Sequence, residues 1–126
     1  MKNTIISFSI FILMLFSIIF SIKYLNNTCI KLQNLNVKIE QAIQANDWEE
    51  SYKNSEHLMA EWKKYSSKLS IFSNHHEIDD INNELWKLLH HITYKNKEEA
   101  LISIDIIKNS IYSILHIQQL NIENLF

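Results

Sequence analysis

The pattern of hydrophobic and polar positions begins with one continuous apolar run. Asn3 to Ile22 is a stretch of 20 residues that carries no charge and is dense in Ile, Phe and Leu. As an α-helix, such a stretch spans about 30 Å, which is the thickness of the hydrocarbon core of a bilayer. The sequence therefore predicts that residues 1–22 form an N-terminal transmembrane signal-anchor, and that Asn3 to Ile22 hold the protein at a membrane.

After this run, apolar residues recur every three or four positions, which is the period of an α-helix with one buried face. The most regular set is Ile78, Ile81, Leu85, Leu88 and Ile92. The predicted fold is all-α: the transmembrane helix continues into a small up-and-down antiparallel bundle of about four helices, formed by residues 23–126. The helices are expected at about 23–45, 48–69, 75–93 and 97–120.

Two of the predicted core faces are irregular. In the first helix, Asn36 occupies a position of the apolar stripe between Leu32 and Ile39. The second helix has a wide face of spaced aromatic and apolar residues, which is expected to be buried. Its members are Trp48, Tyr52, Met59, Trp62 and Leu69, widened by Leu58 and Tyr65.

Helix starts have to be found from capping residues, because the chain contains no glycine and no proline. In three places an Asp or Asn is followed three residues later by Glu, which is the spacing of a capping box. The first side chain accepts a hydrogen bond from an unpaired backbone N–H, and the glutamate reaches back toward the N-cap. The three pairs are Asp47 and Glu50, Asn74 and Glu77, and Asn96 and Glu99.

The apolar run is expected to be retained, with a cleaved secretory signal as the main alternative. Cleavage needs small residues at two nearby positions, and no Ala occurs before Ala42. Lipidation at Cys29 is not expected, because the residues before it lack the small residue that bacterial lipoproteins place there.

The orientation of the anchor is a separate question. The positive-inside rule sets Lys2 and the terminal amine against Lys23 and Lys31, which is close to a tie. Short N-termini before an apolar run usually stay in the cytoplasm. We therefore expect a single-pass protein of the cell membrane with the bulk of the chain extracytoplasmic.

Composition excludes several classes of site. Without glycine, tight hairpins could obtain positive-φ residues only from Asn or Asp, which disfavours a β-sheet. Phosphate-cradling loops, dinucleotide-binding turns and the nucleophile elbow all require glycine and are excluded. The formal net charge is −2 and the chain has no arginine, so nucleic-acid binding is not expected. The single cysteine excludes an internal disulfide.

Short polar motifs follow the apolar anchor in order: Asn46-Asp47-Trp48-Glu49, Trp62, Asn74-His75-His76-Glu77-Ile78-Asp79, Asn96-Lys97-Glu98-Glu99-Ala100 and a closing Asn124-Leu125-Phe126. With this order, nearly the whole chain resembles a family of uncharacterised short proteins from clostridia and related Firmicutes. The most specific part is the Asn-His-x-Glu-Ile-Asp stretch that begins at Asn74. Asn46-Asp47 departs from the family pattern, where Gly-Asp is common. The resemblance implies a membrane-anchored helical domain of unknown function and no activity.

Histidines are the residues best suited to chemistry in this chain. His76, Asp80, Glu84 and His91 form a stripe along the third helix, and His75 lies beside it; of these, His75, His76, Asp80 and His91 are the candidate metal ligands. The zinc-protease motif needs a second histidine that is absent here. Di-iron bundles need a glutamate three residues before a histidine, and no histidine of this chain has one. A capped helix entrance therefore explains these residues better, and no metal or cofactor is expected.

Tryptophans at helical spacing usually fill the core of a small bundle, so core packing is favoured over a ligand pocket. Trp86 departs from the apolar face of its helix and is the first candidate for a contact with a protein partner. The apolar end of the chain, with Leu125 and Phe126, is the second candidate, with folding back onto the bundle as its alternative.

The sequence leaves two classes of function open. The first is a membrane-tethered interaction or structural module that assists a membrane-protein partner or an envelope process. The alternative is an extracytoplasmic metal or pH sensor that uses His75, His76, Asp80 and His91. An enzyme is not expected, because no nucleophile is paired with a base, and a small-molecule ligand is not expected either.

Overall fold

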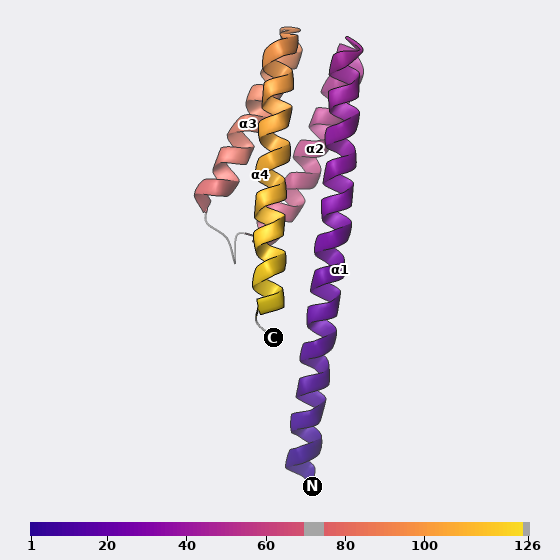
Figure 1. Ribbon diagram of the computed structural model, residues 1–126, viewed down its shortest axis with the longest axis vertical. Helices are drawn as coiled ribbons and strands as arrows, with labels where there is room; N and C mark the ends of the chain where they lie inside the picture. The colour runs from indigo at the N-terminus through magenta and orange to yellow at the C-terminus, as the bar shows by residue number, and fades with distance from the viewer. Residues whose placement is uncertain (70–74, 125–126) are drawn as a thin grey trace.

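The three-and-four periodicity of the sequence is realised as helices throughout. The computed structural model describes residues 1–69 and 75–124, with residues 69 and 117–124 described by their backbone alone. Within this part of the chain there are four α-helices and no β-strand (Figure 1). They are α1, Lys2–Gln44; α2, Trp48–Leu69; α3, His75–Thr93; and α4, Lys97–Asn124.

The helices form an up-and-down antiparallel bundle (Figure 1). Each helix packs against its neighbour in sequence, and α4 returns to pack against α1, so that the four helices close into a ring of neighbouring pairs. The prediction of an all-α protein whose long first helix continues into a four-helix bundle is confirmed.

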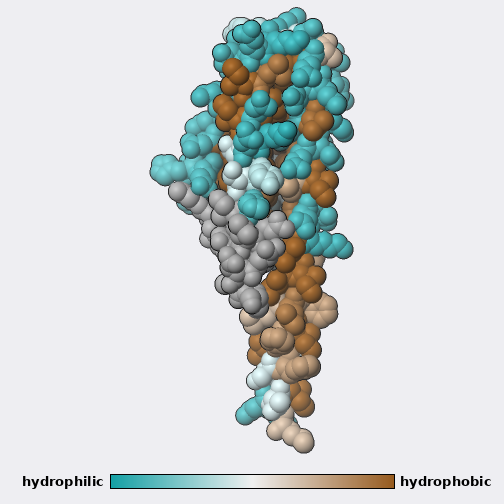
Figure 2. All heavy atoms as spheres, viewed as in Figure 1, coloured by the Kyte–Doolittle hydropathy of each residue, from teal (hydrophilic) through white to brown (hydrophobic). Residues whose placement is uncertain are grey.

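Helix α1 has two halves in different surroundings. No side chain before Leu25 is buried, whereas Leu25, Leu32, Leu35, Ile39 and Ile43 are buried in the bundle. The first half projects beyond the other three helices (Figure 1), and Figure 2 shows hydrophobic residues along it. Among the described residues, α1 is the one helix long and apolar enough to cross a membrane, a property that membrane anchors and signal sequences share.

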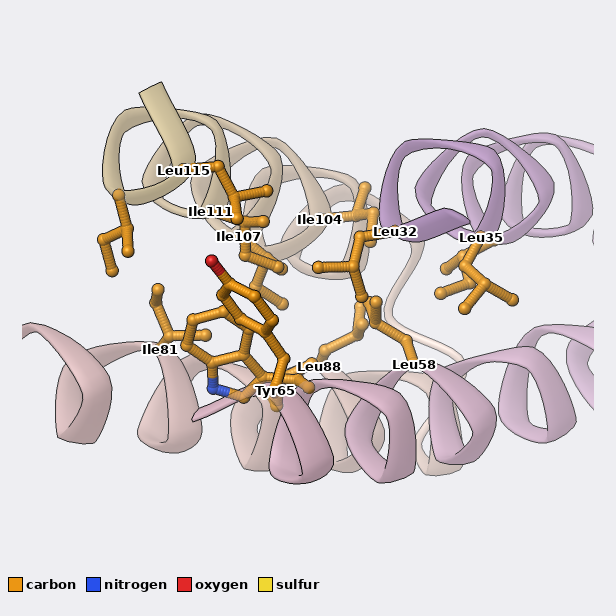
Figure 3. Close-up of a cluster of buried hydrophobic side chains, with 14 of the residues drawn as sticks. Leu32, Leu35, Leu58, Tyr65, Ile81, Leu88, Ile104, Ile107, Ile111 and Leu115 are labelled. Carbon is orange, nitrogen blue, oxygen red and sulfur yellow. The ribbon is translucent and has the colours of Figure 1, made fainter. Parts of the chain in front are cut away.

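The core lies between all four helices, and Figure 3 shows labelled leucines and isoleucines from each of them facing one another around Tyr65. The regular stripe predicted in α3 is buried completely. Buried positions of α4 also follow the predicted spacing: Ile104, Ile107, Ile111, Ile114 and Leu115.

The buried face of α2 differs from the predicted one at its N-terminal end. Tyr52 is 41% exposed, and the small residues Ser51 and Ser55 are buried in that region. Both serine hydroxyls donate to a carbonyl four residues earlier, at 2.7 Å, to Asp47 and Ser51 respectively. Because these hydrogen bonds satisfy the hydroxyls locally, the serines can be buried and the larger aromatic ring can remain at the surface.

The turn between α1 and α2 ends one helix and begins the next within three residues. Asn46 adopts φ 58°, in the left-handed region. The backbone N–H groups of Asn46 and Asp47 donate to the carbonyls of Ile43 and Ala42, at 3.0 and 2.9 Å, which is the pattern of a Schellman motif. The Asp47 carboxylate then accepts from the Glu50 N–H at 3.2 Å and caps α2.

The turn between α3 and α4 repeats this arrangement. Lys95 adopts φ 56°, and the N–H groups of Lys95 and Asn96 donate to the carbonyls of Ile92 and His91, at 3.0 and 2.8 Å. The Asn96 side-chain oxygen accepts from the Glu99 N–H at 3.4 Å. Lys95 lacks the short polar side chain that eases this conformation in asparagine, and the two helix-ending hydrogen bonds hold it there.

Two of the three predicted caps, Asp47 and Asn96, are therefore confirmed, and Asn74 lies outside the described residues. At these two caps, the predicted contact of the glutamate side chain with the backbone N–H of the N-cap residue is replaced by another hydrogen bond of that N–H. The backbone N–H groups of Asp47 and Asn96 already donate to the preceding helix, which leaves the glutamates exposed.

Candidate functional site

Polar contacts join each helix to its neighbour around the bundle, and they show which polar residues are already engaged in structure. Each joins a side chain on one helix to an acceptor on the next. They are Lys31 Nζ to Glu61 Oε2 at 3.1 Å, Trp62 Nε1–H to Asn82 Oδ1 at 3.1 Å, Ser103 Oγ–H to Glu84 Oε1 at 2.9 Å, and Lys97 Nζ to the Gln44 carbonyl at 3.0 Å.

The histidine stripe of α3 is spread along the helix. His76 and His91 are fifteen residues apart, which corresponds to about 22 Å along the axis, far beyond the reach of one metal ion. Glu84, between them, accepts the Ser103 hydrogen bond and lies 3.8 Å from Lys87. Within residues 1–69 and 75–124, no group of three His, Cys, Asp or Glu side chains is placed to hold a metal ion.

The start of α3 borders a small cleft on the side of α4. Glu77 and Asp80 line it together with Ser110 and Ser113, and its volume is about 210 Å³. His75 and His76 are exposed and are not among the residues that line it. The cleft thus brings Asp80 together with a carboxylate and two hydroxyls.

Of the residues predicted to contact a partner, the structure describes Trp86 and not the two at the end of the chain. Trp86 is 65% exposed on α3 and lies on one face with His90 and Tyr94, at steps of four residues. Tyr94 is 72% exposed, and its ring lies 4.7 Å from that of His90. We call these three residues the α3 aromatic stripe. Leu125 and Phe126 lie outside the described residues.

A second cleft lies between α1 and α2, directly after the apolar half of α1, and its volume is about 270 Å³. We call it the α1/α2 cleft. It contains three lysines and one glutamate, together with neutral polar and aromatic side chains. The residues that line it are Tyr24, Asn27, Thr28, Lys31, Leu32, Glu61, Lys64, Tyr65 and Lys68.

Glu61 is the electrostatic centre of this cleft. Its carboxylate lies 3.1 Å from Lys31, 3.8 Å from Lys64 and 3.6 Å from His57. The hydrogen bond from Lys31 lowers the pKa of Glu61 below its ordinary value, and the nearby positive charges act in the same direction while burial opposes them. Glu61 is therefore an anion that holds three cationic or basic side chains around it.

The aromatic rings of the cleft form a layered contact. The rings of Tyr24 and Tyr65 are stacked with their centroids 6.0 Å apart, and Lys68 Nζ lies 4.8 Å from the centroid of the Tyr24 ring. This distance suits a cation–π interaction. The stack fixes Lys68 at the end of the cleft nearest the apolar half of α1, because Tyr24 follows Ile22 by only two residues.

Behind the cleft, the Tyr65 ring points from α2 into the core toward α4 (Figure 3). Its hydroxyl is buried and has no hydrogen-bond partner among the described residues. Burial raises the pKa of Tyr65, with smaller contributions from Tyr24 and Cys29, and burial also raises the pKa of the Cys29 thiol. Both groups are therefore neutral at physiological pH, and Cys29 lacks the thiolate character of a reactive cysteine.

Sequence reasoning did not identify the α1/α2 cleft. The steps of three and four between Glu61, Lys64 and Lys68 place them on one face of α2, which is the only local signal. Their meeting with Tyr24 and Lys31 depends on how α1 and α2 are aligned. That alignment is set by core packing, which a one-dimensional pattern does not contain.

Comparison with known proteins gives a family and no function. No curated protein and no solved structure matches the chain. The match to a family covers residues 19–125, which include the end of the apolar run and all four helices of the bundle. The chain therefore belongs to the DUF4363 family, which is described as a domain of unknown function.

Proposed function

We propose that the protein is a single-pass, membrane-tethered helical module that assists a membrane-protein partner or an envelope process and has no catalytic activity. The observation that carries this proposal is the two-part character of α1. Its first half exposes large apolar side chains, among them Phe8, Phe11, Phe16 and Phe20, and its second half belongs to the bundle core. A continuous apolar surface of this size is unfavourable in water and is matched by lipid.

The proposal places the bundle outside the cytoplasm. The test uses single cysteines in a Cys29→Ser background, with Lys53→Cys in α2 and Lys2→Cys at the N-terminus as its topological counterpart. A membrane-impermeant maleimide is expected to label Lys53→Cys in intact cells and Lys2→Cys only after permeabilisation. The reverse result would place the bundle in the cytoplasm, and the mass of the purified chain shows whether the apolar run is retained.

The α3 aromatic stripe is the surface that we assign to the protein partner. Exposed aromatic side chains are enriched at the centres of protein interfaces, where truncating one often costs more than about 2 kcal/mol of binding free energy. Trp86, at 65% exposure, is not needed to fill the core. His90, four residues after Trp86, packs its ring against that of Tyr94.

The partner assignment is tested by Trp86→Ala with Tyr112→Ala as the matched control. Tyr112 is 52% exposed on α4, so its truncation removes an aromatic side chain of similar exposure from another face. Membrane proteins crosslinked to the wild-type protein in cells are expected to be lost from Trp86→Ala and kept by Tyr112→Ala. Equal recovery with both variants would remove the assignment of the partner to this stripe.

A further inference from the structure

The membrane end of the α1/α2 cleft, at Tyr24 and Lys68, lies at the level where a lipid headgroup would be, if Asn3 to Ile22 span a bilayer. The helix rises about 1.5 Å per residue, so Tyr24 lies about 3 Å beyond Ile22 and Lys31 about 14 Å beyond it. The headgroup layer of each leaflet is about 5 to 8 Å thick. Tyr24 and the Lys68 ammonium above its ring therefore fall within this layer. A tyrosine at this height is typical of membrane interfaces.

The helix directions make the lysines of the cleft converge. Side chains of an α-helix lean toward its N-terminus. The N-terminus of α1 is the membrane end, whereas α2 runs in the opposite direction. Lys31 on α1 therefore leans toward the membrane, and Lys64 and Lys68 on α2 lean away from it, into the same space. The contacts of Lys31 and Lys64 with one carboxylate, that of Glu61, agree with this convergence.

The charge of the cleft is opposite to that of the chain. Three ammonium groups face the single carboxylate of Glu61, while the whole protein has a formal net charge of −2. Among the described residues, no carboxylate is within ion-pair distance of Lys68, whose ammonium is held over a ring. The cleft thus retains positive charge after its internal ion pairs are formed, on a protein that is acidic elsewhere.

The remaining side chains suit a ligand in which an anionic group carries an uncharged polar substituent. Asn27 and Thr28 offer neutral hydrogen-bond donors, and Leu32 and the Tyr65 ring provide an apolar wall. The volume, about 270 Å³, is below the range usual for drug-sized ligands and suits a small headgroup. A zwitterionic headgroup with a quaternary ammonium would add a further cation to this space, whereas a phosphodiester with hydroxyl groups would not.

We propose that the α1/α2 cleft binds the phosphodiester headgroup of an anionic phospholipid in the leaflet that surrounds the exit of α1. Lys31, Lys64 and Lys68 contact the phosphate oxygens, and Asn27 and Thr28 contact the rest of the headgroup. This inference rests on the proposed membrane anchoring. It goes beyond it by naming a ligand and a site that determine which lipids surround the anchor and how the bundle is seated on the bilayer.

The test uses the full-length protein in detergent micelles that contain phosphatidylcholine and phosphatidylglycerol, with retained lipids counted by native mass spectrometry. The variant Lys64→Gln/Lys68→Gln removes two charges of the cleft. The matched variant Lys23→Gln/Lys63→Gln removes two charges from exposed lysines at the same end of the protein that do not line the cleft. One lysine near an anionic surface changes affinity about fivefold, so the first variant is expected to lose at least about tenfold in phosphatidylglycerol retention.

The control variant loses only diffuse attraction to the anionic surface and keeps the phosphate contacts of the cleft, so its loss of phosphatidylglycerol retention is expected to be at least about threefold smaller than that of Lys64→Gln/Lys68→Gln. Equal losses in both variants would overturn the proposal, because they would show diffuse attraction rather than a site. A third arm titrates inorganic phosphate into the wild type in phosphatidylcholine alone. Saturation of the cleft by inorganic phosphate, without dependence of lipid retention on Lys64 and Lys68, would also overturn it in favour of a soluble anion.

The failure of anchoring can be told apart from the failure of lipid selection. If the wild-type protein sediments free of vesicles of either composition, the membrane tether itself is wrong. If the wild-type protein inserts equally into both, and the two double variants behave like it, the proposed membrane tether is supported and the proposed headgroup site is wrong.

Discussion

At the scale of single residues, the bundle contains buried polar groups that no hydrogen bond from the described residues compensates. Both side-chain atoms of Asn36 and the hydroxyl of Tyr65 are buried without a hydrogen-bond partner among the described residues. A buried unsatisfied polar group costs about 1–3 kcal/mol. Asn36 also lies in the apolar stripe of α1, where leucine or isoleucine occupies the neighbouring core positions.

Replacing Asn36 with leucine is expected to stabilise the protein. Leucine has the same γ-branched shape, and the change removes the desolvation cost of an unbonded amide, so the free energy of unfolding should rise by about 1–3 kcal/mol. Chemical denaturation of the full chain in mild detergent, followed by circular dichroism, measures this difference. Asn109→Leu, at an exposed position of α4, is the control and should change the value by less than about 0.5 kcal/mol. A less stable Asn36→Leu protein would show that the amide has a partner in solution.

Glu61 gives a pH-dependent prediction. Because its pKa in the folded protein is lowered from 4.5, mainly by Lys31, the ionised form contributes stability that is complete above pH 4.5 and is lost as the pH falls through the lowered pKa. At neutral pH, Glu61→Gln is expected to unfold more easily by about 0.5 kcal/mol. The difference from the wild type should disappear in acid. A difference that stays constant from pH 7 to pH 3 would assign the effect to packing instead of charge.

At the scale of elements, the two interhelical turns solve the same problem without glycine. Each uses one residue at positive φ, two hydrogen bonds that end a helix, and an Asp or Asn that caps the next. Asn46 suits this conformation better than Lys95, because a short polar side chain tolerates the left-handed region.

Lys95→Gly is therefore expected to stabilise the bundle by about 1 kcal/mol, since glycine removes the steric cost of the left-handed conformation. Asn46→Gly should raise the free energy of unfolding by a few tenths of a kcal/mol at most, because asparagine has only a small steric penalty in this conformation. Thermal unfolding of the three proteins under identical conditions measures the order. Lys95→Ala serves as the control, and a gain as large as that of Lys95→Gly would point to the loss of the charge.

The regular elements could be predicted from the sequence because their signals are local. The stripe from Ile78 to Ile92 has the helical period over its whole length, and α3 buries it as expected. The N-terminal face of α2 could not be predicted, because Ser51 and Ser55 are buried by satisfying their hydroxyls on their own helix. A polarity pattern does not distinguish such a serine from an exposed one.

At the scale of the whole molecule, the chain combines an exposed apolar half-helix with a bundle that has its own core. Since no residue before Leu25 contributes a buried side chain, removing residues 1–22 should leave the bundle core intact. The chain of residues 23–126 is expected to remain in aqueous buffer without detergent and to keep a strongly helical far-UV spectrum. Sedimentation and circular dichroism test this. An unfolded or aggregated fragment would show that the bundle depends on the apolar half of α1.

The candidate sites were less predictable than the fold, and the reason also lies at this scale. The α1/α2 cleft joins residues more than thirty positions apart in the sequence. The histidine stripe shows the opposite case, because His76 and His91, which the sequence pattern groups as candidate ligands, lie too far apart along α3 to share a site. In a helix, the number of residues between two positions determines their separation along the helix axis. Chemistry between helices depends on their relative register, which many apolar contacts determine together.

The continuity of α1 through Lys2–Gln44 has a mechanical consequence. The helix has no proline or glycine at which it would bend, and about 33 Å of it stands beyond Ile22. If the lipid-embedded part leans by about 20°, as spanning helices commonly do, Gln44 swings sideways by about 11 Å. The helix then acts as a lever, so bilayer thickness, by setting the lean, decides which neighbours the far end of the bundle can reach.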